Sequence, residues 1–277
     1  MIYTSLESLA QQFDAFLIDQ FGVLLNGSGA YEFAPRSLKK LAKFGKPIVL
    51  LSNSGKRAVS NESRLTKLGF SRDSYLVVMS SGEAAYYELS RRIGNSLPQR
   101  AKIWLHARDN DTSAIDGLDM YRVNNPDDAD LLLLAGSNAD TINFENYISL
   151  LMTAARRRIP MICTNPDLIM LTAGDSHPGA GAIAEAYAKC GGPVELIGKP
   201  YPLIYAEAAR YFSGIAADRI LCIGDSPSHD IAGGKAAGHK TVLVRTGLHA
   251  DDTESELIEF CTNDMMPDFM IRAFDFP

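Results

Sequence analysis

The sequence predicts an α/β fold in which parallel strands alternate with helices along most of the chain. Short apolar runs recur throughout the 277 residues, and amphipathic segments separate them. This alternation is typical of β–α units, which build a parallel sheet covered by helices. The chain is also long for one compact core, so we expect one large domain and a second, smaller unit.

The first part of the chain predicts a core of such β–α units. The apolar run at 15–19 indicates a strand, and a helix follows that begins at Pro35 and ends at Gly45. Proline suits the first turn of a helix and glycine its end. The other elements expected before residue 81 are a strand at 46–52, a helix at 56–68 and a strand at 74–80.

A second set of α/β elements is predicted in the middle of the chain. The candidate site residues described below all lie outside roughly 80–180, which indicates an inserted domain. We therefore expect a discontinuous core of residues 1–79 and 181–277 and an inserted α/β domain at 80–180. The elements expected in the insert are strands at 102–107, 130–136 and 159–165 and a helix at 147–158.

The first core is expected to resume after the insert. Apolar runs and amphipathic segments alternate there as they do near the N-terminus, and a final helix and strand are expected from Asp251 onward. The other elements expected in this part are strands at 194–198, 219–224 and 240–246 and helices at 203–212 and 231–237.

The composition excludes several classes of protein. The net charge is −6, and the densest basic run, three arginines at 156–158, fits a solvated helix end better than a nucleic-acid site. The chain shows no apolar run of membrane-spanning length, and we expect no signal peptide, because residues 1–16 lack a basic start and a long apolar stretch. The four cysteines form no CxxC pair, which favours reduced thiols. We expect a cytoplasmic protein without nucleic-acid or membrane partners.

Four polar residues stand at the ends of apolar runs, namely Asp19, Ser52, Lys199 and Asp225. The carboxyl ends of parallel strands meet at one edge of a sheet, so these side chains are expected to converge. Two carboxylates, a hydroxyl and an amine are groups that metal-assisted phosphoryl transfer uses. Each alone has a simpler explanation, such as a turn cap, a helix cap or a solvated loop lysine. The four in this order are far more specific.

The loop after the strand at 219–224 carries two acids, Asp225 and Asp230. Such a pair suits Mg²⁺, which takes one or two carboxylates and keeps several waters. The alternative is an acidic helix N-terminus, where Asp230 would favour the helix dipole. Ser52 and Asn53 precede a helix, whose free N–H groups can hold a phosphate.

These residues resemble the motifs of the haloacid dehalogenase superfamily. The insert resembles the α/β cap of its class IIA members, the NagD-type phosphatases. The resemblance covers almost the whole chain and implies a Rossmann-like core with a parallel sheet plus an inserted α/β cap. The segments that carry it beside the four polar residues are TNPD at 164–167, PGAGAIAEA at 178–186 and IGKPYPLIYAEA at 197–208.

The resemblance also implies roles for the site residues. Asp19 matches the nucleophile and Lys199 the catalytic lysine, which offsets negative charge and binds phosphate. Ser52 matches the phosphate-binding residue of the second motif, with Asn53 beside it as a further substrate-binding candidate. The Mg²⁺ ligands implied are Asp19, the backbone carbonyl of Phe21, Asp225 and Asp230.

Phe21 departs from the pattern of the family. The phosphatases use an aspartate at this position as general acid and then as general base, and Phe21 carries no exchangeable proton. Proton transfer of this kind is worth about 10²–10⁴-fold. Candidate substitutes are His229 in the fourth motif and the cap residues Asp167 and His177, although a solvated or helix-capping role explains each of them better.

Three readings of the function stay open. The one we favour is a Mg²⁺-dependent phosphatase that acts on a small phosphorylated metabolite, a sugar phosphate or similar, through an aspartyl-phosphate on Asp19. It would use a substitute proton carrier, a substrate whose leaving group needs little protonation, or slow turnover. The second is a relative that binds a phosphorylated ligand and turns it over slowly or not at all. The third is a dehalogenase, since DQFGV at 19–23 resembles DxYGT, but the α/β cap and the acidic fourth motif count against it.

The cap loop that reaches toward the substrate in the family corresponds to Leu168-Ile169-Met170-Leu171 and then Thr172 to His177. Its apolar start favours a neutral or partly apolar leaving group, although the same residues could pack a hinge. The resemblance also leaves a homodimer open, since caps of this class often supply a dimer contact.

Overall fold

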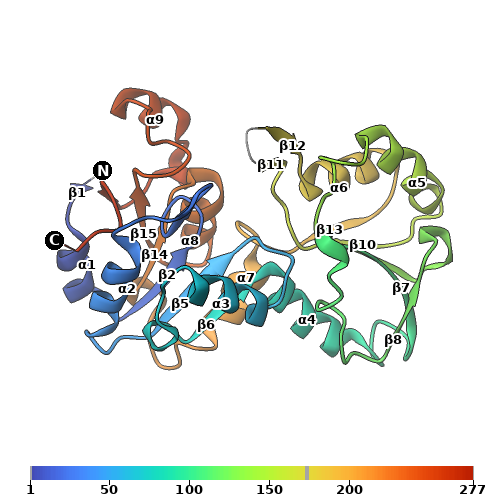
Figure 1. The fold of residues 1–277 in the computed structure, drawn as a ribbon, viewed down its shortest axis with the longest axis horizontal. Helices are drawn as coiled ribbons and strands as arrows, with labels where there is room; N and C mark the ends of the chain where they lie inside the picture. The colour runs from blue at the N-terminus through green and yellow to red at the C-terminus, as the bar shows by residue number, and fades with distance from the viewer. Residues whose placement is uncertain (1, 172–174, 277) are drawn as a thin grey trace. The chain divides into compact units, whose positions relative to one another are not determined.

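The computed structural model describes residues 2–171 and 175–276 of the chain (Figure 1). These residues form two compact units, each with its own main sheet. Unit 1 contains residues 2–52, 59–79 and 199–276, and unit 2 contains 53–58, 80–171 and 175–198. The prediction of an α/β fold with parallel sheets is confirmed.

Unit 1 contains a seven-stranded sheet in the order β1-β16-β15-β14-β2-β5-β6. Every residue of its central strands β14, β2 and β5 is buried. This burial explains their continuous apolar sequences, because helices cover parallel strands on both faces. The strands are β1 (Ile2–Tyr3), β2 (Ala15–Asp19), β5 (Ile48–Ser52), β6 (Val77–Ser80), β14 (Ile220–Gly224), β15 (Lys240–Val244) and β16 (Phe269–Ile271).

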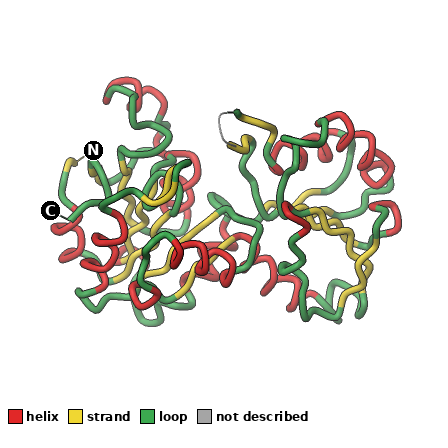
Figure 2. The backbone as a smooth tube through the Cα atoms, in the orientation of Figure 1, coloured by secondary structure: helices red, strands yellow, loops and turns green. Residues whose placement is uncertain are grey.

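Helices connect these strands, as the red and yellow segments of Figure 2 show. Pro35 lies in the first turn of α2, so the predicted start is off by one residue, but the helix ends at Ala42, three residues before the predicted Gly45, which has a φ of 69°. The helix after Lys199 begins at Pro202, so a proline occupies the first turn of this helix as well. The helices of unit 1 are α1 (Leu6–Gln12), α2 (Ala34–Ala42), α3 (Ala58–Lys67), α7 (Pro202–Ala209), α8 (Ala232–Ala236) and α9 (Glu254–Phe260).

Short elements complete unit 1. A small antiparallel hairpin, β3 (Leu25–Asn26) and β4 (Gly29–Ala30), follows β2 directly. A turn of π-helix, η5 (Pro227–Ile231), lies between β14 and α8. The single turns of 3₁₀-helix are η1 (Arg72–Ser74), η4 (Ala217–Arg219) and η6 (Asn263–Met265).

Unit 2 contains a five-stranded parallel sheet in the order β13-β10-β9-β7-β8. Helices α5 and α6 pack on this sheet through a cluster of buried apolar side chains that includes Leu132, Tyr147 and Tyr187. The main elements are α4 (Ser81–Arg92), β7 (Ala101–His106), β8 (Met120–Val123), β9 (Leu131–Leu134), α5 (Phe144–Arg156), β10 (Met161–Cys163), α6 (Ala180–Lys189) and β13 (Val194–Leu196). The smaller ones are the hairpin β11 (Ile169–Leu171) with β12 (Ser176–Pro178) and the 3₁₀ turns η2 (Arg108–Asn110) and η3 (Pro126–Asp128).

The expected return to the core at residue 181 is too early. Val194 of β13 pairs with Met161 of β10, so this strand belongs to the sheet of unit 2. The compact unit ends at Gly198, and unit 1 resumes at Lys199. Residues 53–58, expected in the core, also cluster with unit 2. The short apolar run of β13 suits either sheet, and only its pairing partner distinguishes the two.

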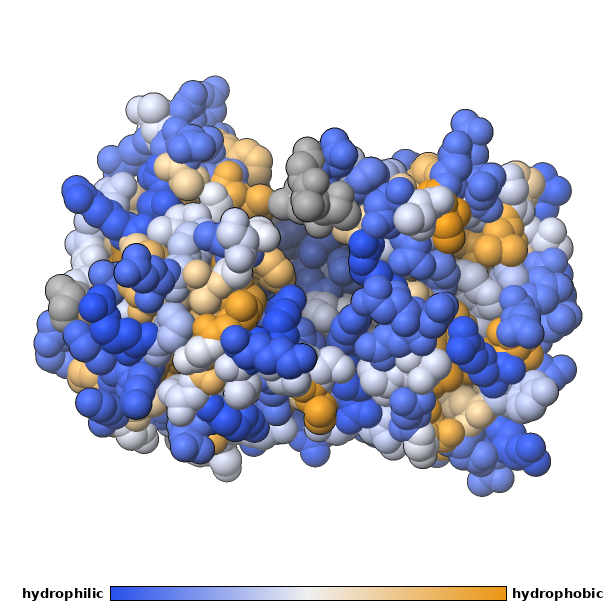
Figure 3. All heavy atoms as spheres, in the orientation of Figure 1, coloured by the Kyte–Doolittle hydropathy of each residue, from blue (hydrophilic) through white to orange (hydrophobic). Residues whose placement is uncertain are grey.

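The surface of each unit is mainly hydrophilic on the face drawn in Figure 3, where hydrophobic residues form small separate groups. Among the described residues, no helix combines the length and the apolar character that crossing a bilayer requires.

Truncation of a core leucine in unit 2 should lower stability far more than truncation of a surface leucine. Leu132 of β9 is fully buried, whereas Leu150 of α5 is 47% exposed. We expect Leu132→Ala to lower the free energy of unfolding by about 2–5 kcal/mol and Leu150→Ala by less than about 1 kcal/mol. Urea denaturation of both variants measures the difference, and equal losses would contradict the assigned core.

Candidate active site

The register of the central strands in unit 1 brings the predicted residues to one edge of the sheet. Asp19, the last residue of β2, pairs with Leu51, the residue before Ser52 in β5. Ile18 pairs with Ile223 of β14, two residues before Asp225. Parallel strands in register end together, so these polar residues follow the apolar strands at the carboxyl edge, where α/β sheets bind ligands.

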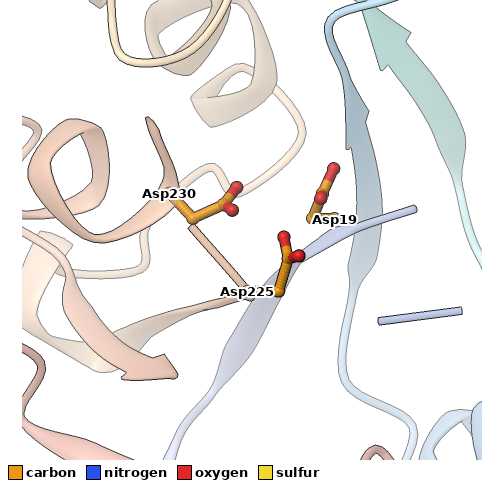
Figure 4. A group of neighbouring side chains, drawn as sticks. All are labelled: Asp19, Asp225 and Asp230. Atoms are coloured by element: carbon orange, nitrogen blue, oxygen red, sulfur yellow. The ribbon is translucent and has the colours of Figure 1, made fainter. Parts of the chain in front are cut away.

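Three carboxylates converge at this edge. One oxygen from each of Asp19, Asp225 and Asp230 lies within 4.8 Å of the others. Figure 4 shows the three side chains pointing into one common space, from the end of β2, the end of β14 and η5. All three are at most 8% exposed. The predicted convergence of these acids is therefore seen in the structure.

Lys199 supplies a positive charge to this cluster. Its Nζ lies 2.5 Å from Asp19 Oδ1 and 2.7 Å from Asp230 Oδ1. The lysine is only 4% exposed, so the ion pairs are poorly screened by water. Lys199 thus holds Asp19 and Asp230 in fixed orientations.

Close backbone approaches position Asp225. A Cβ atom at Gly22 would lie 2.0 Å from Asp225 Oδ2, and a Cβ at Gly247 would lie 1.8 Å from the same oxygen. Gly22 also has a φ of 81°, which disfavours any other residue there. The backbone N–H of Leu248 donates to this carboxylate oxygen at 2.8 Å. Glycines at both positions are therefore required by the space that Asp225 occupies.

The turn η5 positions Asp230. The Ser226 N–H donates to Asp230 Oδ2 at 3.1 Å, and the Ser226 side chain accepts a hydrogen bond from the His229 N–H at 3.3 Å. A Cβ at Gly224 would lie 2.1 Å from the carboxyl carbon of Asp230. The loop therefore folds the second acid back onto the end of β14.

Burial and mutual repulsion change the pKa values of the cluster. Burial raises the pKa of Asp225 to about 6, and the charge of Asp230 adds to this effect. Burial also raises the pKa of Asp19, although the Lys199 ammonium opposes it. Burial disfavours the charged form of Lys199, but Asp19 and Asp230 outweigh it and raise the lysine pKa.

This donor set fits a divalent cation. When all three carboxyl groups are ionised, three carboxylates face one ammonium, which leaves an excess of two negative charges in a buried position. Oxygen ligands of this kind suit Mg²⁺ and other hard divalent ions. The backbone at Gly22 passes against Asp225, and Phe21 is the residue before Gly22 in the chain. The role of the Phe21 carbonyl as a metal ligand stays a prediction.

The phosphate-binding candidates lie next to one another in sequence but cluster with different units. Ser52 is buried at the end of β5 in unit 1. The Asn53 amide, in unit 2, donates to Asp167 Oδ1 at 2.8 Å. Asp167 is therefore a hydrogen-bond partner of Asn53. The substrate-binding roles of Ser52 and Asn53 stay predictions.

Phe21 lies directly beyond the acid cluster in sequence and is 50% exposed. Its ring stacks on the guanidinium of Arg64 in α3, with 5.1 Å between the carbon of the guanidinium and the ring centre. Arg64 also donates to the side chain of the fully buried Gln20 at 2.7 Å. Arg64 was missed by the sequence analysis, since a helical arginine carries no signal that it contacts residue 21.

The candidate proton carriers have separate surroundings. His229 Nδ1 lies 3.2 Å from Ser226 Oγ within η5. His177 lies on β12 opposite Met170 of β11. Of the predicted cap loop, Leu168 and Ile169 are exposed, and residues 172–174 lie outside the described residues. No proton-carrying role follows from these positions, so all three candidates stay predictions.

Gly247 and Leu248 were also missed. They follow β15 in the sequence RTGL, and their contacts with Asp225 become visible only when that strand is placed beside β14. A glycine just after a strand is a weak signal of a close backbone approach.

We expect Mg²⁺ to stabilise the protein more at pH 8 than at pH 5. The pKa of Asp225 is about 6 in the folded protein, whereas the ordinary pKa of an aspartate is 3.8. Without metal, the protonated Asp225 carboxyl stabilises the folded protein fully below pH 3.8, and this stabilisation is lost as the pH rises through about 6. The difference between the two pKa values of Asp225 corresponds to about 3 kcal/mol of folding free energy.

Thermal unfolding with and without Mg²⁺ at both pH values measures this effect. The metal competes with the proton for the carboxylate, so its stabilisation grows across the same range. Asp225→Asn should reduce the Mg²⁺ effect at pH 8. An equal Mg²⁺ effect at both pH values would argue against a metal at these acids.

Two family models match the chain. The model described as haloacid dehalogenase-like hydrolase matches residues 16–120, and the one described as HAD-hydrolase-like matches residues 196–270. The sugar-phosphatase AraL of Bacillus subtilis (strain 168) is 32% identical over 239 residues, which cover 83% of this chain and 82% of AraL.

Solved structures share the whole fold. A haloacid dehalogenase-like hydrolase from Brucella suis 1330 matches with a TM-score of 0.82 and 26% identity, over 98% of this chain and 99% of that one. The p-nitrophenyl phosphatase from Archaeoglobus fulgidus matches with a TM-score of 0.76 and 29% identity, over 95% and 97% of the two chains. Together with the similarity to AraL and the inserted α/β unit, these matches show that the chain belongs to the haloacid dehalogenase-like hydrolases, in the class IIA branch of NagD-type phosphatases.

Proposed function

We propose that this hydrolase is a Mg²⁺-dependent phosphatase that acts on a small phosphorylated metabolite, a sugar phosphate or a similar compound. The observation that carries the proposal is the buried cluster in which Lys199 holds Asp19 beside Asp225 and Asp230. A carboxylate fixed next to a metal site is suited to attack phosphorus in line.

Asp19 forms the covalent intermediate in this proposal. One carboxylate oxygen attacks phosphorus, and the bond between phosphorus and the leaving-group oxygen breaks. Water then attacks the same phosphorus, the bond to Asp19 breaks, and inorganic phosphate leaves. Lys199 orients Asp19 throughout and offsets the charge of the transferred group.

The remaining site residues hold the phosphoryl group and the metal. The Ser52 hydroxyl and the Asn53 amide bind the phosphate oxygens at the end of β5. When bound to Asp19, the Phe21 carbonyl, Asp225 and Asp230, Mg²⁺ would offset the negative charge that the phosphoryl group carries.

Unit 2 serves as the cap in this proposal and unit 1 as the catalytic core. The boundary at Lys199 supports this division, because the lysine opens the returning segment of unit 1 while the whole five-stranded sheet belongs to unit 2. The name of the relative AraL, a sugar phosphatase, supports the choice of substrate class.

Asp19→Asn should abolish Mg²⁺-dependent release of phosphate from p-nitrophenyl phosphate, because an amide cannot act as the nucleophile. Asp14→Asn is the matched control: Asp14 immediately precedes β2, its side chain is 47% exposed, and it pairs with Arg219. The control should keep the wild-type rate. Phosphate release and trapping of a phosphorylated Asp19 are the measurements.

Two results would contradict the proposal. One is an Asp19→Asn variant that releases phosphate at the wild-type rate. The other is a wild-type protein that shows neither turnover nor a trapped phosphoenzyme, which would indicate a phosphate-binding relative instead.

A further inference from the structure

We propose that this site expels its leaving group without protonating it, so that phosphate esters of weakly basic alcohols, such as phenols and enols, react far faster than alkyl esters. The inference rests on the proposed phosphatase function and narrows its substrate class: among sugar phosphates and similar compounds it favours those with a weakly basic leaving oxygen, such as enol and anomeric phosphates, over ordinary alkyl esters. It follows from what surrounds Asp19 in unit 1.

Residue 21 offers no proton to a group bound at Asp19. The Phe21 ring is apolar, half exposed and stacked on Arg64. The polar group behind the ring is a guanidinium, which keeps its proton in proteins. The following residue is Gly22, fixed there by its closeness to Asp225.

The charged groups beside Asp19 form ion pairs with one another or accept hydrogen bonds from the backbone. Lys199 bridges Asp19 and Asp230 at 2.5 and 2.7 Å, so its N–H groups point at these carboxylates. Asp225 accepts from the backbone N–H of Leu248, and Asp230 accepts from that of Ser226. These groups bind charge and hold position, and their contacts assign none of them to proton transfer.

Two tyrosine hydroxyls of unit 1 also have partners. Tyr31 donates to the Thr246 carbonyl, and Tyr205 donates to the His229 carbonyl at 3.2 Å. The His229 ring nitrogen Nδ1 faces Ser226 Oγ. His229 is therefore one group of unit 1 that could compete as a proton donor.

The chemical step then depends on the leaving group itself. When the Asp19 oxygen bonds to phosphorus, the electron pair of the breaking P–O bond moves onto the leaving oxygen, which departs as an oxyanion. A phenolate or enolate carries that charge easily, whereas an alkoxide does not. In the second step water adds to phosphorus, Asp19 regains its carboxylate, and both protons of the water stay with the phosphate.

The test is the dependence of kcat/KM on the leaving group. Wild-type protein with Mg²⁺ is assayed on nitrophenyl, chlorophenyl, phenyl and glycerol phosphates, in order of increasing basicity of the leaving group. Because kcat/KM covers the steps up to release of the alcohol, slow hydrolysis of the intermediate does not mask the effect. We expect kcat/KM to fall steeply along this series, by at least about 10²-fold, the contribution usually made by general acid catalysis.

Substitutions at position 21 separate proton transfer from polarity. Phe21→Asp should raise kcat/KM for glycerol phosphate by about 10²–10⁴-fold and flatten the dependence on the leaving group. Phe21→Asn introduces a side chain of the same size as aspartate but without a transferable proton, and it should keep the steep dependence. Thermal unfolding of both variants checks that they fold, which the 50% exposure of Phe21 favours.

The outcomes distinguish this inference from the proposed function. A shallow wild-type dependence with Asp19-dependent turnover overturns the inference and leaves the phosphatase standing, since another group must then donate the proton. Equal effects of Phe21→Asp and Phe21→Asn also overturn it. Absence of turnover with every ester, nitrophenyl phosphate included, overturns both.

Discussion

The site depends on the burial of three carboxylates, Asp19, Asp225 and Asp230, around one lysine. Such a cluster is costly, because like charges repel strongly away from water and each loses its hydration. Lys199 offsets part of that cost through two short ion pairs. The excess negative charge that remains is what suits the edge of this sheet to a divalent cation.

The rest of unit 1 can be understood as support for this cluster. Strands β2, β5 and β14 end in register, which brings Asp19, Ser52 and Asp225 to one edge of the sheet, and the turn η5 adds Asp230. Gly22, Gly224 and Gly247 leave the space that the carboxylates occupy. Backbone N–H groups of Ser226 and Leu248 complete the hydrogen bonding of two of the acids. Glycines and backbone N–H groups therefore leave space for the carboxylates and bind them at positions where a larger side chain would clash.

Phe21 separates two parts of phosphatase chemistry that one site usually combines. The residues expected to bind metal and phosphate and to attack phosphorus lie around Asp19, whereas residue 21 presents an apolar ring on Arg64. Attack requires a fixed carboxylate and compensated charge, and proton transfer requires a titratable group at the right atom. In the proposed mechanism, the contacts of Asp19 with Lys199 serve the first requirement, and the apolar ring of Phe21 does not serve the second.

The sequence by itself determined the α/β class, the strands at 15–19, 46–52 and 219–224, and the identity of the acids and of Lys199, because strand periodicity and polar residues at strand ends are local signals. Only the tertiary structure decided that β13 joins the sheet of unit 2, that Gly247 and Leu248 enclose Asp225, and that Arg64 supports Phe21. These features depend on which distant segments pack together. A short apolar run, a glycine or a helical arginine fits several partners equally well until the strands are paired.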